Sequence, residues 1–274
     1  MVKGQLPDEG PARLGPVTLP AGRLITGYGG TDHVAWATVV PVPESGRVWA
    51  ALSGLHPRTG LVPIQLDSLD ADAGRPWDGG DFLEPQDPRE ADRLEAGAVL
   101  ENLWRGSVWA DVDDPEAMQR WAPFTLQWPG LAAPEPTPLT PAGRQHALDV
   151  VLPRIRVAYG VAPEARIALV AAGRPADVLA VIGWGGLVNQ PGSPLLPLTA
   201  VLRSWEDRFG ARLIDVGYDT LRLLVDRPPR TVEAAQRVAA EQVVLADDCI
   251  DEGRDVPGIA ARLVNALIWT FWWD

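Results

Sequence analysis

Cysteine and lysine are almost absent from this chain of 274 residues. Cys249 is the sole cysteine, so the chain cannot form an internal disulfide, and a zinc site built on a cysteine cluster is excluded. Lys3 is the only lysine, so nearly all of the positive charge is arginine. Together with the many Ala, Gly and Pro residues, this bias indicates the coding of a high-GC bacterial genome rather than a function.

An excess of positive charge is also missing. The chain has 24 basic and 36 acidic residues, which gives a net charge of −12. Such a chain repels phosphate backbones and anionic lipids, so we expect neither nucleic acid nor a membrane surface as a partner. An acidic surface is compatible with a basic protein partner and also with simple solubility.

No hydrophobic run approaches the roughly 20 residues that a membrane-spanning helix needs. The opening MVKGQLPDEGPARLG lacks the basic and apolar regions of a signal peptide, so we expect a cytoplasmic protein. Hydrophobic residues make up 46% and charged residues 22% of the chain, as in ordinary globular proteins. This composition argues against extensive disorder.

Recognisable catalytic motifs are absent as well. The three histidines, His33, His56 and His146, accompany neither a G-x-S-x-G motif nor the H-x-x-H spacing of a zinc site. The glycine clusters at 27–30 and 183–186 lack the spacing of a phosphate-binding loop, so we interpret them as turns or bulges. The sequence therefore predicts no cofactor.

The N-terminal part contains short extended segments separated by Gly and Pro. We expect a loose arm over residues 1–15, and strands at 24–28, 33–40 and 47–52. A turn followed by a further strand is expected over 56–66.

Loops and two helices complete this part. Residues 67–90 predict a surface loop, and the Asp-Pro pairs at 87–88 and 114–115 predict helix starts. The inner face of the first helix would consist of Leu94, Ala98, Leu103 and Trp104. Six prolines between 123 and 141 indicate a linker, and we place a domain boundary near residue 140.

The C-terminal part has a more regular pattern. Strands are expected at 165–171 and 177–184, and Pro197 begins a helix whose apolar residues recur at helical spacing. That buried stripe consists of Leu198, Val201, Leu202, Trp205 and Phe209. Gly210 stands where a C-terminal cap belongs.

Two strands joined by a tight turn follow over 211–227, then a helix capped by Thr231, a shorter helix over 257–266 and a last strand over 268–274. From residue 177 onward this order is the βαββαβ pattern with one extra helix. We therefore expect an α+β protein, in which a strand-rich part (16–140) packs on a C-terminal ferredoxin-like α/β sandwich (141–274).

The chain ends on the aromatic segment IWTFWWD, whose alternation places apolar side chains on both faces of the last strand. Helices would cover one face, and the N-terminal part would cover the other. We therefore interpret the terminal tryptophans as a clamp between the two parts.

Several segments of the C-terminal part resemble a known family. PADVLAVIGWGG, LTAVLRSWEDRFGARLIDVGYDTLRLLVDRPP, TVEAAQRVAAEQ and the closing FWWD are similar to the DUF4253 family, a bacterial domain of unknown function common in actinobacteria. The resemblance covers about 155–274, and VWAALSGLHPRTGLVPIQL resembles the segment that often precedes the domain. Where the family pattern has His or aromatic residues and Cys-Pro-Asp after A-A-E, this chain has Gln242, Val243, Leu245 and Ala246, with Cys249 displaced. The resemblance implies no activity.

Two groups of charged residues are candidate sites. Asp247, Asp248 and Asp251 have the D-D-x-x-D spacing that holds magnesium on a helix face, although a solvated acidic turn explains them more simply. Glu206, Asp207 and Arg208 lie between the inward-facing Trp205 and Phe209, and we interpret them either as a recognition surface or as a solvated or ion-paired helix face. Asp274 is a candidate exposed tip.

The function that best fits these observations is a non-catalytic cytoplasmic module that binds another protein, for example an immunity protein that neutralises a toxin. Two alternatives stay open. One is a carboxylate-based hydrolase or metal-assisted phosphate enzyme with its site between the two halves. The other is a sensor that holds a small ligand in a tryptophan-lined pocket.

Overall fold

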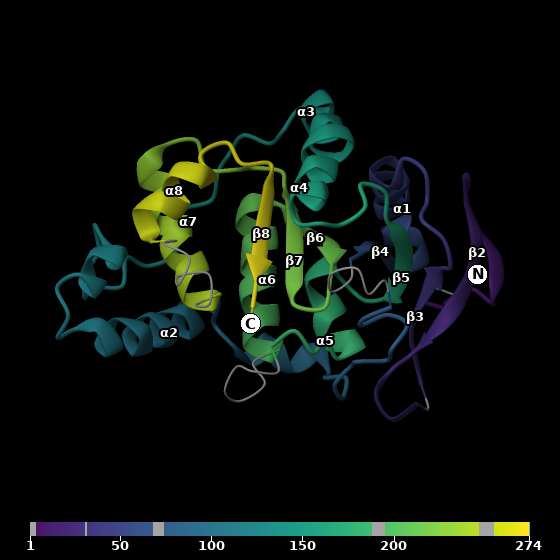
Figure 1. Ribbon diagram of the computed structural model, residues 1–274, viewed down its shortest axis with the longest axis horizontal. Helices are drawn as coiled ribbons and strands as arrows, with labels where there is room; N and C mark the ends of the chain where they lie inside the picture. The colour runs from purple at the N-terminus through teal and green to yellow at the C-terminus, as the bar shows by residue number, and fades with distance from the viewer. Residues whose placement is uncertain (1–3, 31, 68–73, 188–194, 247–254, 274) are drawn as a thin grey trace.

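A single mixed β-sheet runs through the computed structural model, which describes residues 4–30, 32–67, 74–187, 195–246 and 255–273. The strand order among these residues is β1-β2-β3-β5-β4-β6-β7-β8. Helices lie on both sides of the sheet (Figure 1). The predicted α+β class is confirmed.

The first three strands, β1 (Gly10–Leu14), β2 (Val17–Thr26) and β3 (His33–Thr38), form an antiparallel meander. The structure thus differs from the loose arm expected over residues 1–15. Strand β1 is ordered because its backbone pairs with β2, and because Ala12 and Leu14 bury their side chains in the core.

The two predicted parts share the sheet. Strand β5 (Arg166–Ala171) lies between β3 and β4 (Leu61–Leu66), and β4 also pairs in parallel with β6 (Ala211–Val216). The antiparallel strands β7 (Thr220–Val225) and β8 (Ile268–Trp272) complete the sheet. The two parts therefore join strand to strand, which differs from the expected packing of one folded part on another.

Residues 47–52 form part of helix α1 (Ser45–Thr59), so the predicted strand there is wrong. Trp49 and Leu52 are buried one helical turn apart, and the Trp49 indole Nε1 donates a hydrogen bond to the Pro63 carbonyl over 2.8 Å. Burial of this helical stripe outweighs the strand preference of valine and tryptophan.

Residues 177–184 are not a strand either. A turn of 3-10 helix (Pro175–Asp177) leads into helix α5 (Val178–Ile182), which ends at Gly183 with φ of 67°. A Cβ on Gly183 would lie 1.9 Å from the Leu83 carbonyl oxygen, so only glycine fits there. Without this strand β8 pairs directly with β7, and the strand order is not the predicted ferredoxin-like one.

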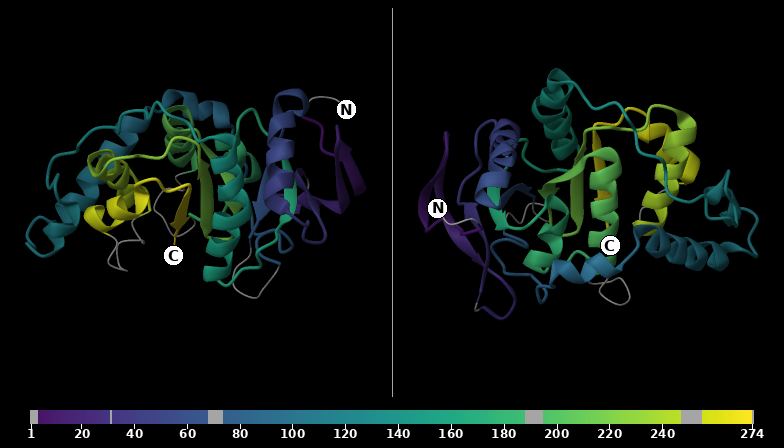
Figure 2. Two further views of the ribbon diagram at one scale, coloured as in Figure 1. Left: turned by 90° about the horizontal axis from the view of Figure 1, so that it is seen from above. Right: turned by 180° about the vertical axis from the view of Figure 1, so that it is seen from behind.

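Helices cover both faces of the sheet (Figure 2). One face packs on α1, a π-helical turn (Ala147–Val151) and α4 (Leu152–Ala158), and α3 (Pro141–His146) leads into the π-helical turn. The opposite face shares a hydrophobic core with α5, α6 (Leu195–Phe209), α7 (Val232–Leu245) and α8 (Val256–Leu263), and α2 (Ala96–Asp111) packs on α6 and α7. None of the helices in the described ranges is both long and apolar enough to cross a membrane.

The helix predicted to start at Asp87-Pro88 is broken in two. A 3-10 segment (Pro88–Arg93) ends at Leu94, whose backbone is extended (φ −103°, ψ 123°), and α2 begins at Ala96. Because of this break, different residues of α2 face the core than the unbroken helix would present. The buried face is formed by Leu100, Trp104 and Val108, and only Trp104 of the predicted face is buried. The second predicted helix is a 3-10 segment, Ala117–Trp121.

The last strand packs its aromatic residues against α6. The buried side chains of Trp269 and Phe271 contact the ring of Trp205 with centroid distances of 5.6 and 5.3 Å, and Trp273 contacts Trp184 at 5.5 Å. These ring partners belong to the C-terminal half. The expected clamp between two parts is therefore mainly a core within that half, since aromatic pairs of this kind stabilise a fold through burial.

Candidate functional site: the α6 groove

A groove of about 310 Å³ runs along the outer face of α6, and we call it the α6 groove. Its walls come from the Pro88–Arg93 segment, the start of α2 and the loop at Leu131. Its charged and polar lining side chains are Asp92, Glu95, Arg174, Arg203, Ser204, Asp207 and Arg208. The groove therefore includes two of the three residues in the predicted recognition surface.

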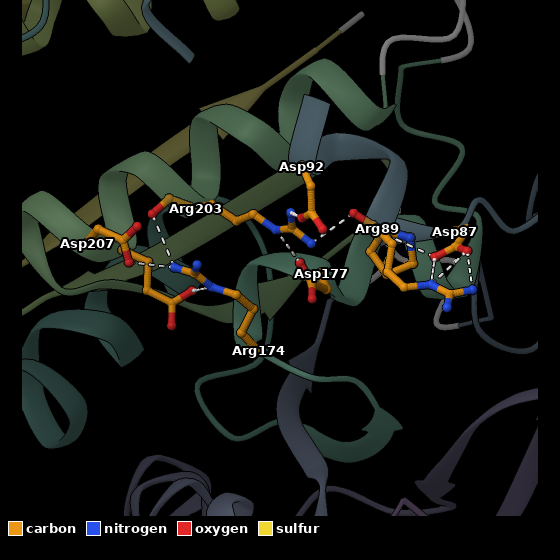
Figure 3. A network of polar contacts seen from close by, with 9 residues as sticks. Asp87, Arg89, Asp92, Arg174, Asp177, Arg203 and Asp207 are labelled. Carbon is orange, nitrogen blue, oxygen red and sulfur yellow. Dashed lines mark hydrogen bonds and ion pairs between the residues drawn. The ribbon is translucent and has the colours of Figure 1, made fainter. Parts of the chain in front are cut away.

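Arg203 connects three segments of the chain at one end of this groove (Figure 3). Its Nε donates to Asp177 over 2.7 Å, its Nη1 to Asp92 over 2.6 Å, and its Nη2 to the Pro88 carbonyl over 2.8 Å. Asp177 is buried, so this carboxylate anchors the guanidinium from below. One arginine thus fixes the Pro88–Arg93 segment against α6.

Arg174 occupies the other end (Figure 3). Its Nε donates to Glu206 over 3.2 Å, and its Nη2 donates to Asp207 over 2.7 Å. The two carboxylates outweigh the opposing effect of burial and raise the pKa of Arg174. The same balance of burial against Asp177 and Asp92 raises the pKa of Arg203, so both guanidinium groups stay charged at neutral pH.

The Pro88–Arg93 segment starts as the sequence predicts. The Asp87 side chain accepts a hydrogen bond from the Arg89 backbone N–H over 3.0 Å, and Pro88 occupies the first helical position. The Arg89 side chain also pairs with Asp87, which together with the backbone bond lowers the pKa of that carboxyl. The cap therefore fixes the chain direction where the Pro88–Arg93 segment begins.

Arg208 is ion-paired, as one interpretation of Glu206, Asp207 and Arg208 expected, but its partner lies on α7 and its side chain is largely buried. Its Nη1 and Nη2 donate to the two oxygens of Glu241 on α7 over 2.8 and 2.6 Å. Glu241 is fully buried and also accepts from the Trp205 indole and the Ala132 backbone N–H. Arg208 joins α6 to α7 because a buried carboxylate needs a charged partner.

The parts of the groove that reach solvent are acidic and apolar. The side chains of Asp92 and Asp207 are 67% and 68% exposed, whereas those of Arg203 and Arg208 are 15% and 11% exposed. Two leucines on the lining, Leu94 and Leu131, are also exposed. A molecule that approaches this groove thus meets carboxylates and leucine side chains before it meets Arg203 and Arg208, whereas the Arg174 side chain is 33% exposed.

The other predicted site residues fall outside the described residues. These are Asp247, Asp248 and Asp251 of the metal hypothesis and the terminal Asp274. Within the ranges that the structure describes, no group of three His, Cys, Asp or Glu side chains could hold a metal ion.

The sequence analysis missed a buried ionic cluster in the sheet. Arg222 on β7 donates from Nη1 to Asp67 over 2.5 Å and to Asp215 over 3.0 Å, and Asp215 also pairs with Arg156 on α4. Burial, together with the neighbouring charge of Asp215, raises the pKa of Asp67 above its ordinary value of 3.8. Tyr159 lies over the Arg222 guanidinium at 5.1 Å.

A signal for this cluster was present in the sequence, because Asp215 and Arg222 each stand between apolar neighbours in two buried strands. Charged residues in buried strands require partners of opposite charge. The four charges compensate one another, and the side chains are nearly inaccessible to solvent. The cluster therefore joins β4, β6, β7 and α4 in the core.

Comparison with known proteins supports the family resemblance for one part of the chain. Residues 166–274 match the family model of DUF4253, a domain of unknown function. No curated protein and no solved structure matches the chain. The matched region contains α6 and β8, whereas Asp92, Leu94 and Leu131 of the α6 groove lie outside it.

Proposed function

We propose that this protein is a non-catalytic cytoplasmic module that binds another protein in the α6 groove. The proposal rests on one observation. Exposed acidic residues lie beside exposed leucines on the groove lining, and arginines of the same lining form ion pairs with those acidic residues. Asp92 and Asp207 are about two-thirds exposed, and Leu94 and Leu131 lie on the same lining.

This combination fits a protein interface. Such interfaces combine apolar contacts with charges that specify the partner. Arg174 and Arg203 hold Asp207 and Asp92 in place, so these carboxylates lose little conformational freedom when a partner binds. A preorganised surface of this kind lowers the entropic cost of recognition.

The negative charge of the solvent-exposed side chains around the groove indicates the class of partner. Asp92, Glu95 and Asp207 are exposed, whereas the arginines beneath them are already paired with carboxylates. We therefore infer a partner whose contact surface carries Lys or Arg side chains. Neutralisation of a basic toxin by this acidic protein, as an immunity protein, is one concrete form of that role.

Capture from the native host tests the proposal. Immobilised wild-type protein is compared with the double variant Asp92→Asn/Asp207→Asn, which removes both exposed charges and keeps the side-chain shapes. The control is Asp113→Asn/Glu116→Gln, which removes two exposed acids beyond the other end of α2.

We expect a stoichiometric partner that the wild type and the control variant retain and the groove variant loses. A partner that all three proteins retain equally would contradict the proposed surface. Repeated absence of any stoichiometric partner would contradict the proposed function.

A further inference from the structure

The two edge strands of the sheet differ in how well they resist pairing with a further strand. Among the described residues the sheet ends at β1 on one side and at β8 on the other. Strand β1 contains Pro11, the exposed Arg13 and a register shift after Pro11. Proline, charge and an irregular register are features that prevent edge-to-edge pairing. Strand β8 has no proline, glycine or charged residue, so it lacks these features.

The pairing of β8 with β7 directs the backbone of alternate residues outward. The Leu267 carbonyl accepts a hydrogen bond from the last residue of β7 over 3.0 Å, and the Trp273 N–H donates over 3.0 Å to the residue just before β7. The register between these two bonds is continuous. Because hydrogen-bonded pairs alternate in an antiparallel ladder, the N–H and C=O groups of Ile268 and Thr270 point away from β7.

A cavity of about 290 Å³ lies along this outward edge. All four residues from Ile268 to Phe271 line it, and their side chains point alternately to the two faces of the sheet. Tyr159, which follows α4, contributes from one side of the sheet, and α7 and α8 contribute from the other. A cavity lined from both sides lies at the edge, and four residues extend about 10 Å along it. Figure 1 shows α8 beside β8, on the side away from β7.

The lining combines apolar side chains with one unpaired charge. Ile259, Leu263 and Phe271 are among the apolar residues. Arg262 on α8 is exposed, lines the cavity and forms no ion pair with any residue that the structure describes. None of the described lining residues is acidic. A guanidinium in this position favours a carboxylate, so an acidic side chain on a ligand would complement the charge of the cavity.

We propose that the outer edge of β8 accepts an extended peptide segment of a partner as an added strand. The peptide backbone pairs with the N–H and C=O groups of Ile268 and Thr270, apolar side chains enter the cavity, and an acidic side chain meets Arg262. In this mode of recognition the main-chain hydrogen bonds supply affinity, and the pockets for side chains supply specificity. The site is separate from the α6 groove, with which it shares no lining residue.

Titration of the full chain with the acetylated and amidated peptide Thr-Val-Glu-Val-Thr tests this site. The readout is the backbone N–H signals of Ile268 and Thr270 in protein with ¹⁵N-labelled isoleucine and threonine, assigned with Ile268→Val and Thr270→Val. We expect a saturable shift of both signals. The same peptide with every backbone nitrogen methylated keeps the side chains and cannot donate ladder hydrogen bonds, so its binding should be weaker by about tenfold or more.

Two protein variants test the edge and the charge separately. Thr270→Pro removes an outward N–H and places a ring on the edge, so it should abolish peptide binding, whereas the matched variant Thr270→Val should retain it. The melting temperature of Thr270→Pro should change little, because this N–H lies outside the ladder with β7. Arg262→Gln should weaken binding by up to about fivefold and remove the preference over a peptide with Lys in place of Glu. Arg58→Gln, at an exposed position on α1, should not.

The proposal is overturned if the peptide shifts neither signal, or if the methylated peptide binds as tightly as the unmodified one. The comparison of the two peptides on the wild type decides the matter even if Thr270→Pro does not fold. Shifts of the same signals with protein concentration alone would show that a second copy of the chain takes the edge, which would also overturn the proposal. These outcomes leave the α6 groove proposal untouched, because the two sites share no lining residue.

Discussion

The two faces of α6 use different interactions. On the inner face Leu198, Val201, Leu202, Trp205 and Phe209 are buried in the core. On the outer face Arg203 and Asp207 form ion pairs at the edge of solvent. Burial of one large side chain is worth about 1.5–3 kcal/mol, whereas an exposed ion pair contributes about 0–1 kcal/mol. The inner face therefore determines stability, and the outer face is free to serve recognition.

Removal of residues 271–274 is the largest perturbation of the inner face. The deletion takes Phe271 and Trp273 out of the core, where each contacts other aromatic rings. Loss of large buried aromatics costs about 3–5 kcal/mol each, so we expect the free energy of unfolding in urea to fall by at least that amount. An unchanged melting temperature would contradict the packing role of the chain end.

Arg208 connects the outer face of α6 to the buried core, because its partner Glu241 is buried. Glu241→Leu leaves the Arg208 guanidinium and the Trp205 indole without their acceptor, which should cost about 3–5 kcal/mol. The double variant Arg208→Met/Glu241→Leu should recover part of that loss, since no buried charge is left unpaired. Urea unfolding of the three proteins measures both effects, and equal stability of the single and double variants would argue against the pairing.

The pH dependence of stability tests the buried ionic cluster. The pKa of Asp67 is raised in the folded protein, so the folded state binds a proton more tightly than the unfolded chain, whose carboxyl has its ordinary pKa near 3.8. Its contribution is therefore fully present below that value and is lost as the pH rises through the folded pKa.

In Asp67→Asn the free energy of unfolding should change less with pH than in the wild type, over the pH range above 3.8. Urea unfolding at successive pH values measures this dependence. A wild-type curve that Asp67→Asn leaves unchanged in shape would show that Asp67 does not titrate differently in the two states.

The smallest effect on stability is expected at the outer face. Asp207→Asn removes one exposed partner of Arg174, and Glu206 still pairs with that arginine. We expect a loss below about 1 kcal/mol in the same urea experiment. If Asp207→Asn lowered the free energy of unfolding as much as Glu241→Leu does, the outer face of α6 would contribute to stability like the inner face. That result would contradict the proposed recognition role of the outer face.

Periodicity alone predicted the inner face of α6. All five residues of its predicted stripe are buried, and Gly210 follows the helix with a left-handed φ of 59°. The cap at Thr231 is also confirmed, since its side chain accepts from the Ala234 N–H over 3.2 Å. These features depend only on residues close together in the chain, so they could be predicted from the sequence.

Features that depend on distant partners were not predictable in the same way. Residues 47–52 form a helix because Trp49 meets Pro63 on β4, and Arg208 turns inward because Glu241 on α7 needs its charge. The α6 groove likewise requires residues 91–97 and Leu131 beside α6. Sequence analysis located Glu206 and Asp207 as candidates but could not identify the side chains that surround them.

Hydrogen–deuterium exchange on the complex with the captured partner tests most directly the claim that the outer face of α6 is the recognition surface. The account predicts slower exchange on binding at residues 90–97 and 203–208, together with unchanged exchange at β1 and β2. Protection confined to regions away from these two segments would contradict it.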